Sequence, residues 1–355
     1  MIIKHFKYFP FLLKLKTPFQ TSYNKISDRK GFIVSITDEH GNTSYGECSP
    51  LPEFSRETID DADTILKNMI DEITGAELND NTGSICEFLS TFKLVPSVRF
   101  ALEQAIFNVM AMRNKNFLNS SFGKFNSQVS VNAVIGFGRQ EDIIKSISIK
   151  YDAGFRTFKI KVGRSSFEDD IKLIGVLREK FGNSINIRLD VNGKWEFDTA
   201  KEPLNSLKTF GIQYIEEPCK GFQNLCLLAE SSQIPVAIDE SILSIRELND
   251  VITRSKIDFI ILKPAIFGTL IAAEEFIKQA GNNNKKIIIS SSFESAIGKS
   301  ALVMLAASSG HSYAHGLDTS GFFERDICKD FYNIEDAHIS FNPENYPPQF
   351  DISLL

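Results

Sequence analysis

The chain has 355 residues, a hydrophobic fraction of 43%, a charged fraction of 24% and a net charge of −6. These are ordinary globular values without a basic stripe, so nucleic acid is not expected as a partner; nor is a membrane, because no apolar run reaches the ~18 residues of a membrane helix. The five cysteines are scattered without a Cys-x-x-Cys pair, and the N-terminus has no signal-peptide pattern, so we expect a reduced, cytoplasmic protein without a structural zinc site.

The first part of the chain, about residues 1–120, has the pattern of strands followed by helices. Two runs with strand character flank a turn rich in Gly, Asn and Asp, which indicates a hairpin. After a short loop, Ser55 is placed to cap the first helix. The expected elements are strands over 31–37 and 44–48 and helices over 58–73 and 98–112. We therefore expect an α+β capping domain here.

From about residue 129 strand-like and helix-like segments alternate. The predicted strands are 129–134, 157–162, 185–191, 213–217, 236–240, 259–264, 286–291 and 313–317. The predicted helices between them are 141–151, 167–181, 199–210, 223–232, 245–255, 269–280 and 296–309. Such alternation is typical of a parallel sheet, and this many units in one domain predict an α/β fold of the (β/α) TIM-barrel type over 121–319. The polar tail, 320–355, is expected to pack back on the capping domain.

Polar residues stand at the ends of consecutive predicted strands. They are Lys161, Asp190, Glu216, Asp239, Lys263 and the serines 290–292. Neighbouring members are separated by about one βα unit, so all are expected at the C-terminal mouth of the barrel, where barrel enzymes have their active sites. Lys159 precedes Lys161 by two residues and shares its face of the strand.

Taken singly, these residues have ordinary explanations. An Asp at a strand end usually caps the next helix, and a Lys-x-Lys pair suits a strand that faces solvent. Five such residues in five consecutive units favour a site. Converging carboxylates would raise one another's pKa, a cost that a divalent cation removes, and an all-oxygen set suits Mg²⁺ or Mn²⁺. Strand parity permits either Glu216 or Glu217 as the ligand.

The lysines on either side of this predicted metal indicate proton transfer. Nearby positive charge is expected to lower a lysine's pKa toward neutrality, so that part of it is the free amine and acts as a base. Lys161 lies on the second predicted strand and Lys263 on the sixth. The chemistry indicated is proton abstraction next to a carboxylate, with stabilisation of the resulting enolate.

At this point the chain resembles a known family. Lys-x-Lys, Asp, Glu, Asp and Lys on successive barrel strands behind an α+β cap are similar to the enolase superfamily, muconate-lactonising subgroup, over nearly the whole chain. Within it, several stretches resemble the o-succinylbenzoate synthases. These stretches are 46–52, 188–190, 216–220, 239–241, 263–264, 290–298 and 316–319.

The resemblance implies a role for each residue of the mouth. Asp190, Glu216 and Asp239 would bind Mg²⁺, which holds the carboxylate of a small-molecule substrate. Lys161 would be the general base, Lys159 would tune its charge, and Lys263 would stabilise the enediolate from the other side. The reaction implied is the syn dehydration of 2-succinyl-6-hydroxy-2,4-cyclohexadiene-1-carboxylate to 2-succinylbenzoate, a step of menaquinone biosynthesis.

Two loops and a serine pair are expected to contact the substrate. The loops around 19–22 and 50–54, with Phe19, Leu51 and Phe54, would close over it and exclude water. Ser291 and Ser292 are candidates to hold the succinyl group, although a merely polar loop explains them as well.

Other functions stay open at this stage. Two opposed lysines also suit an N-acylamino acid racemase or a dipeptide epimerase of the same superfamily. The Asp-x-Asp pair that the dipeptide epimerases carry on the eighth strand is missing around Leu317, which counts against them. A non-catalytic binding protein on a barrel scaffold would not need opposed bases, and a hydrolase barrel would need histidines at the mouth. The sequence leaves the oligomeric state open.

Overall fold

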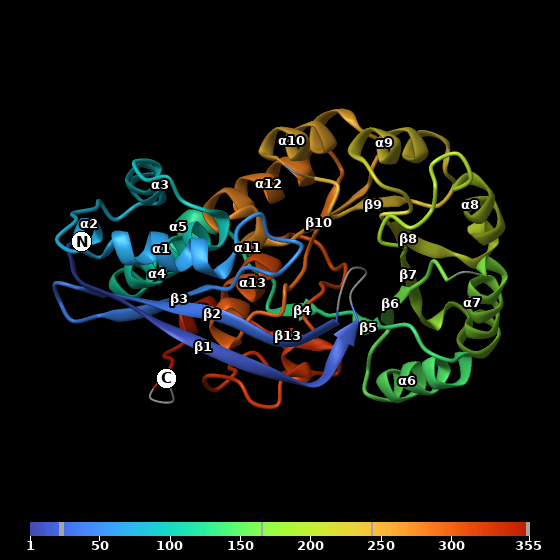
Figure 1. Cartoon of the computed structure of the whole chain (residues 1–355), viewed down its shortest axis with the longest axis horizontal. Coiled ribbons are helices and arrows are strands. Elements are labelled where there is room, and N and C mark those ends of the chain that lie inside the picture. Colours follow the sequence, from blue (N-terminus) through green and yellow to red (C-terminus); the bar gives the residue numbers. More distant parts are fainter. Residues whose placement is uncertain (21–24, 165, 243, 353–355) are drawn as a thin grey trace.

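A computed structural model describes residues 1–20, 25–164, 166–242 and 244–352 of the chain (Figure 1). The first part forms an antiparallel sheet in the order β1-β2-β3, with helices packed on one face. Its strands are β1 (Ile3–Gln20), β2 (Lys25–Asp38) and β3 (Thr43–Cys48). Its helices are α1 (Ile59–Asn68), α2 (Ile70–Ile73), α3 (Thr82–Ser90), α4 (Pro96–Arg113) and α5 (Phe117–Phe122).

Helix α4 packs directly on the backbone of β3. A Cβ atom at Gly46 would lie 1.9 Å from the carbonyl oxygen of Ala101, so only glycine allows this approach. The predicted cap at Ser55 is wrong, because α1 begins at Ile59 with Thr58 as its N-cap in a capping box with Asp61. The Ser55 hydroxyl instead accepts a hydrogen bond from the Leu51 N–H at 2.9 Å and so closes the preceding loop.

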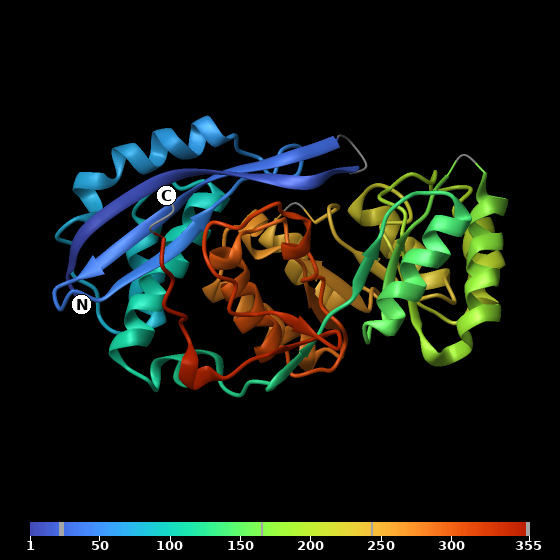
Figure 2. The same cartoon turned by 90° about the horizontal axis from the view of Figure 1, so that it is seen from below.

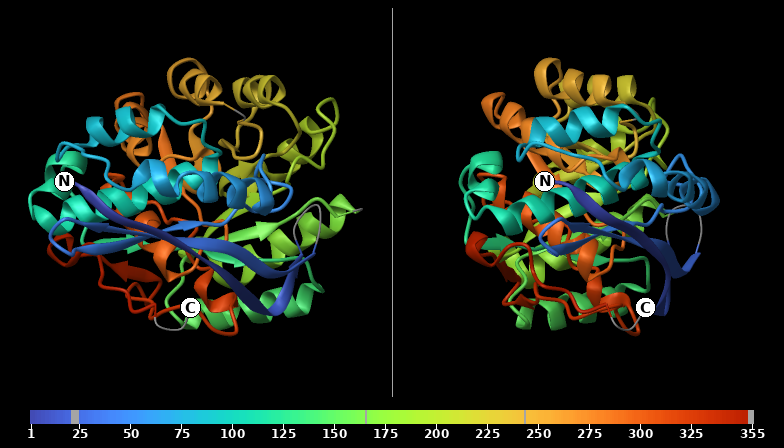
Figure 3. Two further views of the ribbon diagram at one scale, coloured as in Figure 1. Left: turned by 60° about the vertical axis from the view of Figure 1, so that its left-hand side comes forward. Right: turned by 90° about the vertical axis from the view of Figure 1, so that its left-hand side faces the viewer.

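The long strand β1 was not expected from the sequence. It pairs antiparallel with β2 from Ile3 to Gln20 and tolerates Pro10 because it is an edge strand. Phe11, Leu13 and Leu15 alternate with exposed residues, and they pack in a cluster that also contains Phe323 and Ile327 of the C-terminal segment. In Figures 2 and 3 this sheet runs along one side of the rest of the molecule.

The second part is a curled sheet of seven parallel strands in sequence order. Its strands are β5 (Ala133–Ile135), β6 (Thr157–Lys161), β7 (Asn186–Asp190), β8 (Ile212–Glu216), β9 (Val236–Ile238), β10 (Phe259–Leu262) and β11 (Lys286–Ile289). The helices around it are α6 (Gln140–Asp152), α7 (Phe167–Phe181), α8 (Lys201–Leu207), α9 (Phe222–Ser231), α10 (Ile245–Arg254), α11 (Pro264–Phe267), α12 (Ile271–Asn282) and α13 (Ala296–Ser308). The predicted α/β fold class is confirmed.

The predicted eighth strand is reduced to single bridges that join the two edges of this sheet. The Gly316 N–H donates to the Ile289 carbonyl at 2.9 Å, and the His315 N–H donates to the Ser130 carbonyl at 2.7 Å. The ring is thereby closed, and the ends of all its strands face one mouth. Within the described ranges, no helix combines the length and the apolarity that crossing a bilayer requires.

Two buried carboxylates of the first part bind helix N-termini of the barrel. Glu47 of β3 accepts hydrogen bonds from the N–H groups of Ser295 and Gly298 at the start of α13, both at 3.0 Å. Glu103 of α4 accepts from the N–H groups of Leu270 and Ile271 at the start of α12. Carboxylates stabilise helix N-termini, so these contacts fix the two parts against each other.

The C-terminal segment contacts both parts of the molecule. The Glu324 N–H donates to the Lys14 carbonyl of β1 at 2.9 Å. Further on, β12 (Ile334–Glu335) and β13 (His338–Ser340) form a small sheet with β4 (Gln128–Ser130) at the start of the barrel. The domain boundaries drawn from the sequence stay a prediction.

Candidate active site

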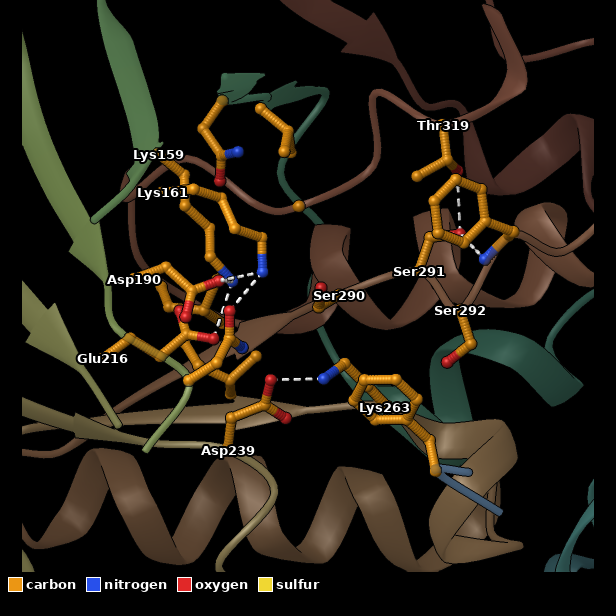
Figure 4. A pocket seen from close by; sticks show the side chains of 18 of the residues that line it. Lys159, Lys161, Asp190, Glu216, Asp239, Lys263, Ser290, Ser291, Ser292 and Thr319 are labelled. Atoms are coloured by element: carbon orange, nitrogen blue, oxygen red, sulfur yellow. Dashed lines mark hydrogen bonds and ion pairs between the residues drawn. The ribbon is translucent and has the colours of Figure 1, made fainter. Parts of the chain in front are cut away.

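A cavity opens at the C-terminal ends of the barrel strands, under the loops of the first part (Figure 4). Every residue that the sequence proposed for the site lines it. These residues are Lys159, Lys161, Asp190, Glu216, Asp239, Lys263, Ser291, Ser292, Phe19, Leu51 and Phe54. The structure thus brings the proposed residues together, while their individual roles stay predictions.

The two lysines of β6 extend from the same face of the strand, as the spacing requires. Phe158 and Ile160 point the other way and are fully buried. Lys159 Nζ lies 2.6 Å from Glu216 Oε1 and 3.1 Å from Asp190 Oδ2. Lys161 Nζ lies 3.2 Å from the same Asp190 oxygen and also donates to the side-chain oxygen of Asn192.

Lys263 reaches the cluster from another side. It follows β10, donates to Asp239 Oδ2 and places its ammonium 5.4 Å from the centre of the Phe54 ring. Figure 4 shows Lys161 and Lys263 on different sides of the carboxylates. A substrate bound between them would meet a lysine nitrogen on each face.

The close packing of charges shifts several pKa values. Burial raises the pKa of Glu216, and the charges of Asp190 and Asp239 add to this against the attraction of Lys159, so the value is well above its usual range. Burial also disfavours the charged form of Asp190, but Lys159 and Lys161 outweigh it and lower its pKa to about 2. Burial therefore dominates at Glu216, where the neighbouring carboxylates add to it, whereas the lysines dominate at Asp190.

The carboxylates hold the pKa values of Lys159 and Lys263 up, whereas the sequence predicted that a bound metal would lower the pKa of the lysines beside it. Burial lowers the pKa of Lys159, but the charges of Asp190 and Glu216 overcome it and hold that pKa well above its usual range. Burial likewise acts to lower the pKa of Lys263, and the Asp239 carboxylate reverses the shift. The reason is that the nearest charges to both ammonium groups are carboxylates rather than cations.

The carboxylates fit a hard divalent cation. Asp190 Oδ1, Glu216 Oε2 and Glu240 Oε2 are all buried without a hydrogen-bond partner. A buried carboxylate oxygen without a partner costs free energy, which an oxygen-binding cation such as Mg²⁺ would recover. Glu216, Asp239 and Glu240 each present one oxygen within 4.8 Å of the others. Glu240 was not among the residues predicted for the site, although its place directly after Asp239 in the sequence was a usable signal.

The structure also separates Glu216 from Glu217. Glu217 directly follows the last residue of β8 and has a φ of 43°. Its carboxylate accepts hydrogen bonds from the Asp239 N–H at 2.8 Å and from the N–H and hydroxyl of Ser241 at 2.9 and 2.7 Å. Glu216 therefore faces the first cavity, and Glu217 holds the loop after β9 and lines a second cavity beside it.

Most polar groups of the serine loop after β11 form hydrogen bonds within the protein. The Ser291 hydroxyl donates to Glu294 Oε2 at 2.6 Å and accepts from the Phe293 N–H at 3.0 Å and from the Thr319 hydroxyl at 2.8 Å. The Ser292 N–H donates to the same Glu294 oxygen. Only the Ser292 hydroxyl of this pair is buried without a partner, so it is the better placed of the two to bind a ligand.

Aromatic and aliphatic side chains enclose the rest of the cavity. Phe19 packs against Phe293 and Phe322 with ring centres 5.1 and 5.5 Å apart. The loop that carries Leu51 and Phe54 is held by Arg29, which is buried and donates to the carbonyls of Ser49 and Pro50 at 2.6 and 2.9 Å. The remainder of the other proposed cap loop, Thr21 and Ser22, lies outside the described residues.

Two family models match the chain. Residues 143–345, more than half of the chain, match the model described as "Enolase C-terminal domain-like". Residues 3–109 match "MenC, N-terminal domain". The two matches correspond to the barrel and to the antiparallel sheet with its helices.

Individual relatives are similar at lower identity. The chain is 24% identical over 338 residues to an o-succinylbenzoate synthase of Bacillus subtilis, which covers 94% of this chain and 90% of that protein. It is 25% identical to the N-succinyl-L-Arg/Lys racemase of Bacillus cereus, with 93% and 91% covered. The Protein PHYLLO, chloroplastic, of Arabidopsis thaliana is 27% identical over 86% of this chain, which spans 20% of that longer protein.

A solved structure supports the same assignment. The crystal structure of the N-succinyl Arg/Lys racemase from Bacillus cereus superposes with a TM-score of 0.87 at 25% identity and covers 96% of this chain and 93% of that one. Fold, cavity and family models thus agree over nearly the whole length. This chain belongs to the enolase superfamily.

Proposed function

We propose that the protein catalyses the Mg²⁺-dependent syn dehydration of 2-succinyl-6-hydroxy-2,4-cyclohexadiene-1-carboxylate to 2-succinylbenzoate. It would thus be a carbon–oxygen lyase of menaquinone biosynthesis acting in the cytoplasm. The observation that carries the proposal is one cavity with lysines on two sides of buried carboxylates and an apolar wall made by Phe19, Leu51 and Phe54. Such a cavity suits a carboxylate on a six-membered ring. The match of residues 3–109 to the MenC model supports this choice.

The cation would be held by the buried carboxylates of Asp190, Glu216 and Asp239, of which Asp190 and Glu216 each have a buried oxygen without a hydrogen-bond partner. When bound, it would neutralise the substrate carboxylate and the charge that develops on it. Lys161 would take the proton next to that carboxylate and then return it to the departing hydroxyl on the same face, so that water leaves and the proton balance closes. Lys263 would stabilise the enediolate from the other side.

Lys159 would act on the charge of the site rather than on the substrate. Its ammonium is paired to both Asp190 and Glu216, at 3.1 and 2.6 Å, and so offsets the repulsion between these carboxylates. Phe54 and Leu51 would exclude water from the enediolate. Because the product is aromatic, the step is strongly downhill and needs only this modest acid–base apparatus.

A second candidate is an N-acylamino acid racemase. The two lysines on different sides of the carboxylates suit removal of an α-proton on one face and its return on the other, and a racemase is among the similar proteins. A dipeptide epimerase is the less favoured function, because it would need carboxylates on the eighth strand to bind the ammonium group of the substrate. Asp318 lies there, but its carboxylate is paired with Lys150 at 2.6 Å.

The test is an assay of the purified full chain with Mg²⁺. The cyclohexadiene carboxylate is followed spectrophotometrically, and N-succinyl amino acids and dipeptides are followed separately for α-deuteration in deuterated water. We expect fast dehydration with slow or no deuteration. Fast deuteration without dehydration would move the protein to the racemases, and no turnover of either substrate class would contradict both candidates.

A further inference from the structure

Glu240 has no role in the proposed mechanism, yet it lies within the carboxylate group. It directly follows Asp239 at the end of β9, and one of its oxygens lies within 4.8 Å of an oxygen of Glu216 and of Asp239. Oxygens that bind the same Mg²⁺ lie about 2.0–2.1 Å from the ion and hence at most about 4.2 Å apart. A side-chain shift of about 1 Å or less would therefore bring all three onto one ion.

An independent observation points to a ligand between these groups. Glu216 is fully buried, and its Oε2 has no hydrogen-bond partner. Glu240 Oε2 is buried without a partner as well. Buried carboxyl oxygens without a donor are costly, and a cation is a partner that both carboxyl groups would accept.

The other oxygen of Glu240 is already used. Glu240 Oε1 accepts a hydrogen bond from Asn192 Nδ2 at 3.2 Å, and the Asn192 side-chain oxygen accepts one from Lys161. Asn192 is held in a left-handed conformation with a φ of 52°, directly after the strand that carries Asp190. Asn192 thus links Glu240 to the lysine proposed as the base.

We propose that Glu240 is a further carboxylate of the divalent-metal centre and faces the ion together with Glu216 and Asp239. Through Asn192 the same side chain positions Lys161 relative to that ion. Glu240 also lines the second cavity, which shares Asn192, Asp239 and Lys263 with the first, so the centre is bordered by both cavities. The inference rests on the proposed function, which supplies the metal.

The test is binding of Mn²⁺ to the full chain, followed as the loss of the free-ion signal in electron paramagnetic resonance. Glu240→Gln keeps the shape of the side chain and removes its charge. We expect its affinity for Mn²⁺ to fall about tenfold or more. The affinity of Asp239→Asn for Mn²⁺ should fall at least as far. Glu247→Gln is the matched control, because Glu247 lines the second cavity outside the carboxylate group, and it should bind as the unaltered chain does.

The outcomes separate the inference from the proposed function. If Glu240→Gln binds Mn²⁺ normally while Asp239→Asn does not, Glu240 is not part of the centre and the rest of the metal site stands. If the unaltered chain binds no Mn²⁺, both the centre and the inference are overturned. Should circular dichroism show that Glu240→Gln is unfolded, Glu240→Asp decides, because it keeps the charge but withdraws it by one methylene; unchanged affinity would overturn the inference.

Discussion

Two regions of the molecule bury charged side chains, and they differ in how these charges are paired. At the junction between the two parts, formed by Arg29, Glu47 and Glu103, each charge is hydrogen-bonded within the chain. Both oxygens of Glu47 accept hydrogen bonds, and Arg29 donates to three backbone carbonyls. At the mouth, formed by the lysines and carboxylates of the cavity, buried oxygens of Asp190 and Glu216 have no partner.

The difference separates a structural from a functional use of buried charge. A buried charge whose hydrogen bonds are all made within the chain stabilises the fold and is strongly destabilising to remove. A buried carboxylate left partly unpaired beside another carboxylate reduces stability and is retained for a ligand or a reaction. Substitutions at the junction should therefore lower stability, and substitutions at the mouth should lower activity.

The largest effect is expected at the mouth, for Lys161→Ala. Removing a general base typically lowers the rate by 10²–10⁴, and we expect kcat to fall about 10³-fold, or about 4 kcal/mol of transition-state stabilisation. Because Asp190 keeps Lys159 as a partner at 3.1 Å, the melting temperature should change little. Steady-state kinetics and calorimetry measure the two effects. Activity close to that of the unaltered enzyme would remove Lys161 as the base.

The next effect is expected at the junction, for Glu47→Ala. The variant leaves the N–H groups of Ser295 and Gly298 without their acceptor in a buried place. Unpaired buried donors cost about 1–3 kcal/mol each, so we expect a loss of about 3 kcal/mol in the free energy of unfolding. Urea denaturation measures this loss. A variant as stable as the unaltered protein would mean that the two buried charge regions do not differ as described.

The serine pair places the same contrast within two neighbouring residues. Ser291→Ala removes a hydroxyl with three partners inside the protein and should lower the free energy of unfolding by about 1–2 kcal/mol. Ser292→Ala removes an unpaired hydroxyl beside the cavity and should instead raise KM by roughly 5- to 10-fold, or about 1–1.4 kcal/mol, with stability unchanged. If Ser291→Ala raised KM and Ser292→Ala lowered stability instead, Ser291 would be the residue that contacts the substrate and Ser292 the structural one.

The sequence was sufficient to predict the barrel and the proposed residues that line the cavity. Alternation of period 2 located Lys159 and Lys161 on one face, and the recurrence of polar residues at strand ends located Asp190, Glu216 and Asp239 at one mouth. Both patterns are local or periodic, so they can be recognised in the sequence without knowing how the chain packs. Helix α7 was predicted with its observed bounds, 167–181, from its amphipathic pattern, and in the structure Ser166 caps it and acidic residues fill its first turn.

What the sequence did not reveal depends on contacts between distant residues. Strand β1 was missed because Pro10 and its lysines are tolerated only at the edge of a sheet, a position that the partner strand decides. The raised pKa of Lys159 results from burial opposed by the closer charges of Asp190 and Glu216, which only distances reveal. The full engagement of Ser291 likewise depends on Thr319, 28 residues away.

The smallest effect is expected at the edge of the junction, where the charge on Asp326 should make the stability of the protein depend on pH. The Asp326 carboxylate accepts hydrogen bonds from the Ala296 N–H at 3.1 and 3.3 Å. Burial nevertheless raises its pKa to about 6, with Glu47 and Asp330 adding to the shift against these hydrogen bonds. Since this pKa exceeds the unfolded value of about 3.9, folding favours the protonated form. The stability that Asp326 contributes is therefore present below about pH 4 and lost as the pH rises through about 6.

Asp326→Asn keeps an acceptor for Ala296 and removes the titration. We expect the unaltered protein to lose stability relative to this variant between pH 4 and pH 7, in urea unfolding curves measured at intervals of about one pH unit. Other groups titrate over this range in both proteins, so the difference between the two curves isolates Asp326. Parallel curves would mean that its carboxyl titrates as in the unfolded chain, and hydrogen bonding rather than burial would then govern charge at this edge of the junction.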